Sequence, residues 1–253
     1  MASATGIPEV DVTGERNAGE DEPLLGRPGD ASQESGQPIY YNLITGTAVI
    51  AQVGIVLLVA SVWASIFLHD IILFSAHPLL NSAGLLVLTQ SILILQPTHT
   101  PAQKRKGTII HFTLNNLAVD LLIAGLVVIE YNKIKGGTHH FESPHGILGL
   151  ITYIFLAIQA LVGFTAYFVP KLYGGETQAK SLYKWHRLSG YVLLVLLLAT
   201  VIAATQTTYI KNAIHIKLWA ILISSILILA GVLPRIKKQK LGLGPKPSGA
   251  FGQ

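Results

Sequence analysis

Six long apolar segments, separated by short polar connections, constrain the fold of this chain more than any other feature. They cover residues 44–68, 77–95, 109–130, 145–169, 188–205 and 216–233. A helix needs about 20 apolar residues to cross a bilayer, and each segment is close to that length. Only 12 % of the residues are charged, whereas a soluble domain carries roughly a quarter. We therefore predict an all-α integral membrane protein, a bundle of six spanning helices.

Four of the nine histidines form a ladder along the chain. His77, His111, His145 and His186 stand at or near the start of four consecutive apolar segments, at intervals of 34, 34 and 41 residues. Each interval is about one membrane span plus one loop, since a span takes about 20 residues. Ionisable side chains so close to hydrocarbon are costly and usually functional. We interpret the four histidines as metal ligands.

The direction of the helices decides which of these histidines can meet. Successive spans run in opposite directions, so His77 and His145 lie near one membrane face and His111 and His186 near the other. Two imidazoles on either side of an iron are the ligands of a bis-histidine haem, so we predict two haems, one near each face. The chain has no cysteine, which excludes thiolate ligands and covalent haem attachment. Both groups are therefore expected to be haem b.

The other five histidines are not expected to bind haem. His69, His99, His139 and His140 lie in polar loops, where histidines are usually solvated. His215 is the serious competitor, because it opens the sixth segment on the side of His77 and His145. Two lysines flank it, however, at positions 211 and 217, and they place it at the level of the headgroups.

Glycines accompany the ladder at positions 84, 146, 149 and 190. A glycine four or seven residues after a histidine lies on the same face of the helix. Without a side chain it lets a flat macrocycle approach, but small residues also serve ordinary helix packing in membranes. Both interpretations stay open at this point.

The basic residues indicate the orientation of the chain. Twelve lysines and arginines lie on the side of His111 and His186, namely Lys104, Arg105, Lys106, Lys171, Lys180, Lys184, Arg187, Arg235, Lys237, Lys238, Lys240 and Lys246. Four lie on the opposite side, at positions 133, 135, 211 and 217. Cytoplasmic loops carry the excess of positive charge, so both termini are expected in the cytosol. The net charge of +5 then reports orientation, and no nucleic-acid binding is predicted.

The two ends of the chain differ in composition from the apolar body. Residues 1–38 hold eight of the thirteen acidic side chains and lack apolar periodicity, which is typical of disorder. We predict a disordered cytosolic tail over residues 1–40, a six-helix domain over 41–234 and a basic cytosolic tail over 235–253. Within the first tail, residues 20–25 read EDEPLL, which resembles an acidic dileucine sorting signal. This pattern favours an endomembrane of the vacuole or lysosome type, with the endoplasmic reticulum or plasma membrane as alternatives.

Several stretches around the ladder resemble the cytochrome b561 family. They read HPLLNSAG (77–84), KRKGTIIH (104–111), SPHGILGL (143–150), ALVGFTAYFVPKLYG (160–174) and KWHRLSGY (184–191). The resemblance spans about residues 70–206, and the stretch 160–174 is most similar to the cytochrome b561 domain-containing subgroup. Three positions depart from the family pattern: Asn81 replaces a methionine, LILQPTHT replaces an aromatic–aromatic–arginine run, and His145-Gly146-Ile147 replaces His-Ser-Trp.

The resemblance implies a function as well as a fold. Members pass electrons from ascorbate across a membrane through two haems b, usually as homodimers, with monodehydroascorbate or ferric iron as the acceptor. It implies an ascorbate-dependent transmembrane reductase, with ligand pairs formed by the second and fourth and by the third and fifth helices. The best matches to the family's ascorbate-binding residues are Arg105, Lys106 and Lys180, although the same charges also serve as the orientation signal.

Some features stay outside this scheme. Tyr131, His139 and His140 are loose candidates near an acceptor on the far face. Asp120 falls in the middle of the third segment, nine residues from His111 and hence about 180° around the helix from it; we expect it to bond Asn116, Gln159 or another polar neighbour. A haem protein with a membrane quinol as donor is an alternative. A small-molecule carrier is a weaker one, because an internal repeat or broken helices would be typical of it.

Overall fold

The computed structural model describes residues 31–241, and all regular elements in this part of the chain are helices. Its α-helices are α1 (Ala48–Phe67), α2 (Ala76–Leu95), α3 (Pro101–Gly136), α4 (Pro144–Phe168), α5 (Glu176–Ser181), α6 (Tyr183–Ala204) and α7 (Leu218–Val232). Short 3-10 or π turns are η1 (Ile39–Leu43), η2 (Leu73–Ser75), η3 (Pro170–Tyr173), η4 (Ile210–Ile214), η5 (Leu233–Arg235) and η6 (Lys238–Leu241). Six helical segments of the described chain are long and apolar enough to cross a membrane. The predicted all-α fold with six spanning segments is confirmed.

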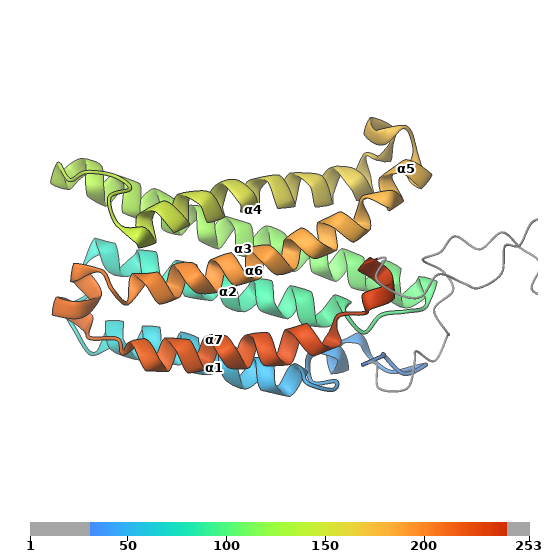
Figure 1. The fold of residues 1–253 in the computed structure, drawn as a ribbon, viewed down its shortest axis with the longest axis horizontal. Coiled ribbons are helices and arrows are strands. Elements are labelled where there is room, and N and C mark those ends of the chain that lie inside the picture. Colours follow the sequence, from blue (N-terminus) through green and yellow to red (C-terminus); the bar gives the residue numbers. More distant parts are fainter. Residues whose placement is uncertain (1–30, 242–253) are drawn as a thin grey trace, which may run out of the picture.

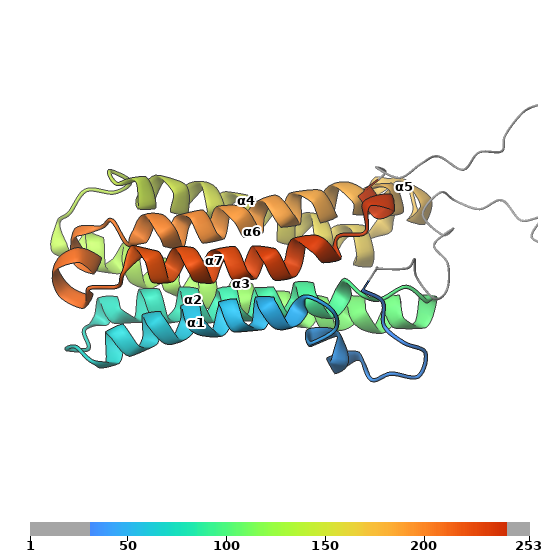
Figure 2. The same cartoon turned by 60° about the horizontal axis from the view of Figure 1, so that its bottom comes forward.

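The long helices lie side by side along one axis (Figure 1). The connections α1–α2, α3–α4 and α6–α7 gather at one end, on the left of Figure 1. The α2–α3 connection, α5 and η6 gather at the other end. Turning the molecule shows α1 and α4 on opposite sides, with the remaining long helices between them (Figure 2). Because α2 and α4 start at one end and α3 and α6 at the other, His77 and His145 lie near one end of the bundle, and His111 and His186 lie toward the other.

Three helix pairs form the closest contacts, α1 with α7, α2 with α3, and α4 with α6. Small residues allow this proximity. A Cβ added to Gly54 on α1 would lie 2.7 Å from the Ser224 carbonyl oxygen on α7, and one added to Gly84 on α2 would lie 2.7 Å from Leu122 Cγ on α3. For Gly84 the structure therefore favours helix packing, because the histidine face of α2 is already covered there by α3.

The longest helix, α3, extends beyond its predicted apolar segment at both ends. Thr100 caps its start by accepting from the Gln103 backbone N–H at 3.2 Å, and Pro101 occupies the first turn, where a missing N–H costs nothing. The helix ends at Gly136 and is capped by the next residue, Gly137, whose φ of 61° is easily reached by glycine. Apolar length alone does not reveal this polar extension, and the short helix α5 was not predicted because it lies between two apolar segments.

The segments that flank the bundle are hydrogen-bonded to it at the end where α2 stops. Arg235 is 97 % buried there and donates from Nη2 to the carbonyl oxygens of Asn42 at 2.8 Å and Leu93 at 3.2 Å. The Asn42 amide in turn donates to Gln33 Oε1 at 3.0 Å. Residues on both sides of the proposed domain boundaries at 40 and 235 thus touch the bundle, and the exact boundaries stay predictions.

Candidate functional site

The rings of His77 and His145 lie next to one another, edge to face, at the end of the bundle where α2 and α4 begin. Their centroids are 6.2 Å apart and their planes differ by 82°. An imidazole nitrogen binds a metal at about 2 Å, so two rings on either side of one ion have centroids roughly 6 Å apart. The spacing of His77 and His145 therefore fits two ligands of one iron.

Hydrogen bonds fix the orientation of three of the four rings. The Nδ1 atoms of His77, His111 and His145 each lie 2.9 Å from a backbone carbonyl oxygen, of Gly125, Ser91 and Thr200 respectively. A carbonyl only accepts, so Nδ1 carries the hydrogen and Nε2 presents its lone pair. Ligating histidines almost always show this arrangement, and these three rings thus fit a haem iron.

The bonded positions form a regular pattern. Ser91 stands fourteen residues after His77 on α2, Gly125 fourteen after His111 on α3, and Thr200 fourteen after His186 on α6. Each helix therefore carries a histidine near one end and, fourteen residues later, a carbonyl that holds a histidine of its antiparallel neighbour. Fourteen residues of helix rise about 21 Å, which is the separation of the two histidine levels along these helices.

His186, on α6, is the exception to this pattern. Gln159, fourteen residues after His145 on α4, donates from Nε2 to the His186 carbonyl oxygen at 2.7 Å. His186 Nδ1 is buried without a partner. A Cβ added to Gly163 would lie only 2.7 Å from His186 Cε1, so Gly163 makes room for the ring. His186 and His111 both lie toward the end of the bundle where α6 and α3 begin, which is the end predicted for the second pair.

Asparagines support the two histidines of the α2–α3 pair. Asn81 and Asn115, each four residues after a histidine, donate from Nδ2 to the carbonyl oxygens of His77 at 2.8 Å and His111 at 2.7 Å. Asn81 also accepts a hydrogen bond of 2.6 Å from the Tyr153 hydroxyl on α4. In the sequence Asn81 stands out only as a departure from a family pattern. Its contacts with His77 and Tyr153 were not predicted, although its position one turn after His77 is a usable signal.

Comparison with known proteins shows to which family the chain belongs. The family model for eukaryotic cytochrome b561 matches residues 76–212, which include all four histidines of the ladder and more than half of the chain. The chain belongs to the eukaryotic cytochrome b561 family. Membership implies that it is a haem protein and a multi-pass integral membrane protein.

Individual relatives are distant. The chain is 27 % identical over 141 residues to the human transmembrane ascorbate-dependent reductase CYB561, a match that covers 55 % of each chain. It is 25 % identical over 128 residues to ascorbate-specific transmembrane electron transporter 2 of Zea mays, covering 51 % of this chain and 53 % of the relative. Transmembrane ascorbate ferrireductase 2 of Arabidopsis thaliana is 27 % identical over 128 residues, covering 51 % and 54 %. The chain therefore spans about half the length of these relatives, and the subgroup is unresolved.

The basic candidates of this cytochrome b561 chain lie at the end shared by His111 and His186. Arg105 and Lys106 are exposed near the start of α3, and Lys180 is exposed on α5, where its Nζ lies 3.8 Å from Glu176 Oε2. The start of α3 and the short helix α5 lie at the right end of the bundle in Figure 1. The three charges thus share one end of the molecule and are accessible to a small anion.

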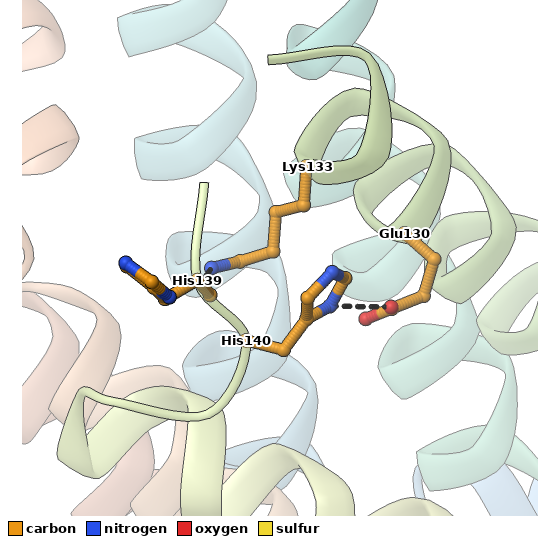
Figure 3. Close-up of polar contacts among 4 residues, drawn as sticks. All are labelled: Glu130, Lys133, His139 and His140. Atoms are coloured by element: carbon orange, nitrogen blue, oxygen red, sulfur yellow. Dashed lines mark hydrogen bonds and ion pairs between the residues drawn. The ribbon is translucent and has the colours of Figure 1, made fainter. Parts of the chain in front are cut away.

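The candidates on the far face lie around the α3–α4 connection, shown in Figure 3. His140 Nδ1 is 2.8 Å from Glu130 Oε2, and Lys133 donates from Nζ to the His139 carbonyl oxygen. Tyr131 is exposed nearby on α3. These contacts tie the loop back to the end of α3, at the end of the bundle that holds His77 and His145.

The remaining histidines are placed apart from the ladder. His215 lies with its ring centroid 6.3 Å from that of His69, in exposed surroundings between α6 and α7. His99, expected to be solvated, instead has a buried Nδ1 without a partner. In the part of the chain that the structure describes, none of the three has a ring contact with His77, His111, His145 or His186.

Asp120 stands in the middle of α3 and faces away from the bundle. It is exposed, and it makes no hydrogen bond or ion pair with any residue between 31 and 241. The expected bond to Asn116 or Gln159 is therefore wrong: Asn116 donates to the Phe112 carbonyl oxygen, and Gln159 bonds Ser189 and His186.

Proposed function

We propose that the chain transfers electrons from ascorbate on the cytosolic face to an acceptor on the opposite face, through two haems b held by His77 with His145 and by His111 with His186. The observation that carries the proposal is the presence of two histidine levels at opposite ends of one membrane bundle. The printed names of the relatives, which include ascorbate-dependent reductase, electron transporter and ferrireductase, support the choice of donor.

The protein's own part in this function is to hold and orient the ligands. A haem iron bound by two imidazoles exchanges single electrons and offers no open position to oxygen. The carbonyls of Gly125, Ser91 and Thr200 fix three rings through Nδ1, which leaves each Nε2 with a lone pair that would bind a haem iron.

The two faces differ in charge, and this difference supports the direction of transfer. Ascorbate is an anion at neutral pH and is attracted by Arg105, Lys106 and Lys180. On the far face, monodehydroascorbate or a ferric chelate is the proposed acceptor, near His139, His140 and Tyr131. The excess of positive charge at the first end also supports cytosolic termini.

Electron transfer across vesicles tests the proposal. Proteoliposomes loaded with ascorbate should reduce an external ferric chelate or monodehydroascorbate, and oxidation of the internal ascorbate should match the external reduction. Empty liposomes and a His77→Ala, His111→Ala variant serve as controls. No transfer by protein that carries both haems in its spectrum would reject the function while leaving the ligand assignment intact.

A membrane quinol as donor is the second candidate, favoured by one observation. A groove of about 430 Å³ opens on the outer surface of α4 and α6, lined largely by apolar side chains with Gln159, His186 and Ser189 among them. Such a groove fits an apolar ring that arrives through the lipid. Reduction of the purified protein by a short-chain quinol, faster than by ascorbate at equal concentration, would favour this donor.

The proposed location rests on the acidic dileucine pattern at residues 20–25, which lies outside the described residues. We propose that it directs the protein to a vacuole- or lysosome-like membrane. Leu24→Ala with Leu25→Ala should relocate a tagged protein without changing its haem spectrum. Unchanged sorting of the double variant would remove this support and leave the endoplasmic reticulum and the plasma membrane as the alternatives.

A further inference from the structure

Two histidines outside the ladder lie next to one another at the end of the bundle where α2 and α4 begin. His69 belongs to the α1–α2 connection and His215 to the α6–α7 connection, and both connections lie at the left end in Figure 1. Their ring centroids are 6.3 Å apart, close to the 6.2 Å between His77 and His145. Both residues are exposed, so the pair is open to water and separate from the haem sites.

The backbone orients His69 as it orients the ligands of the ladder. His69 Nδ1 lies 2.7 Å from the Ser65 carbonyl oxygen. A carbonyl oxygen only accepts, so Nδ1 carries the hydrogen and Nε2 presents its lone pair. Ligating histidines almost always show this arrangement, in which the second ring nitrogen is held by an acceptor. His69 therefore offers one imidazole nitrogen to a metal ion outside the bundle.

The position of His215 is fixed by the fold. Its φ of 53° lies in the left-handed region, which few residues other than glycine adopt. Its backbone N–H donates to the Ile210 carbonyl oxygen at 2.7 Å and closes the π turn η4. Ile210 and Ile214 of this turn are buried together with Ile66 at the end of α1. This packing joins the two connections, so the spacing of the two rings follows from the fold.

We propose that His69 and His215 bind a divalent transition-metal ion, Cu²⁺ most tightly and Zn²⁺ less so. Imidazole suits copper and zinc, whereas Mg²⁺ and Ca²⁺ require oxygen ligands. The described residues contain no group of three side chains that could hold a metal ion, so water completes the coordination and the ion can exchange. Asp70 adds negative charge beside the pair; Lys211 and Lys217 are exposed, and salt screens their opposing charge. The site does not depend on the proposed electron transfer.

Titration of the purified haem-loaded protein with Cu²⁺, after removal of any histidine tag, tests the site. Electron paramagnetic resonance should show one Cu²⁺ per chain coupled to two nitrogen nuclei. Asparagine is the suitable replacement at both positions, because its amide can still donate to the Ser65 carbonyl oxygen and because it tolerates a positive φ. His69→Asn and His215→Asn should each weaken Cu²⁺ binding about tenfold or more, since even the loss of a partner that only orients a ligand has an effect of that size.

His139→Asn is the matched control, at an exposed loop histidine of the same end, and it should bind Cu²⁺ like the wild type. The visible spectrum of both haems should be unchanged in every variant, which shows that each is folded. Equal Cu²⁺ affinity of the wild type and the His69→Asn, His215→Asn double variant would overturn the proposal. A loss of affinity in His139→Asn as large as in the other two would also overturn it, because binding would then be unspecific.

Thermal unfolding in the presence of Zn²⁺ is an independent measurement, because this ion has no redox chemistry. An ion that binds the folded protein and not the unfolded one raises the melting temperature as its concentration rises. We expect this rise for the wild type with Zn²⁺ and none with Mg²⁺ at equal concentration. The double variant should show no rise with either ion. The same rise in the double variant as in the wild type would mean that the stabilising ion does not bind at this pair.

Discussion

His111 on α3 holds its imidazole by donating from Nδ1 to the Ser91 carbonyl oxygen on α2, fourteen residues after His77 on that same helix. In the same way, His77 Nδ1 donates to the carbonyl oxygen of Gly125 on α3. Each helix of this antiparallel pair thus carries one candidate ligand and the support for the other. The distance between the two histidine levels along this pair is therefore set by the rise of fourteen helical residues.

The pairing of the histidines leads to the first prediction. His77→Ala or His145→Ala should remove one haem, and His111→Ala or His186→Ala the other, because each pair is proposed to bind one iron. Haem content and reduced-minus-oxidised spectra of purified variants measure this. Double variants within a pair should keep one haem, whereas double variants across pairs should keep none. A folded His77→Ala, His145→Ala protein without any haem would refute the pairing.

The parts of the fold and of the candidate site that could be predicted are those marked in the sequence by residue type or spacing. The six spans and the side of each histidine follow from apolar length and alternating direction, which need no tertiary information. The carbonyl partners were not predicted, because a backbone acceptor at Ser91 or Thr200 has no residue-type signal. Spacing alone, with Asn81 and Asn115 each one turn after a histidine, could have revealed the supporting residues. The outward direction of Asp120 depends on how α3 packs, and apolar periodicity does not report it.

The second prediction concerns Tyr153, whose hydroxyl bridges α4 and α2. It donates to Asn81 Oδ1 at 2.6 Å and is 3.0 Å from the Leu122 carbonyl oxygen. Tyr153→Phe removes these bonds at a cost of about 1 kcal/mol in stability and frees the Asn81 amide beside His77. We expect the midpoint potential of one haem to shift while haem content stays at the wild-type level.

Tyr191→Phe is the matched control for this variant. The Tyr191 hydroxyl accepts from Gln96 Nε2 at 3.2 Å at the opposite end of the bundle. Loss of this hydroxyl should leave the midpoint potential of the haem proposed at His77 unchanged. Redox titration followed by optical or electron paramagnetic resonance spectroscopy distinguishes the two haems. If Tyr153→Phe leaves both potentials unchanged, Asn81 does not influence His77.

The third prediction concerns Arg235, which joins three parts of the chain. Its Nη2 bonds the carbonyl oxygens of Asn42 and Leu93, at the ends of η1 and α2. Arg235→Met keeps much of the apolar stem but leaves these buried acceptors unpaired, each at a cost of about 1–3 kcal/mol. We expect a lower melting temperature in detergent. Arg105→Met, at an exposed position, should melt like the wild type; equal melting of Arg235→Met would show that the buried contacts contribute nothing net.

The fourth prediction separates the two meanings of the basic cluster at Arg105, Lys106 and Lys180. If these charges attract ascorbate, replacing all three with glutamine should slow haem reduction severalfold at low salt and flatten its salt dependence. The reason is that attraction between exposed charges is screened beyond about 8 Å at physiological ionic strength. Stopped-flow reduction in oriented vesicles measures the rate.

Lys133→Gln with Lys135→Gln on the far face is the control, and it should leave reduction by ascorbate unchanged. Oxidation of the reduced protein by a far-side acceptor should also be unaffected by the triple variant. A wild-type reduction rate at low salt would mean that the cluster determines only the orientation of the chain, and that the donor binds elsewhere.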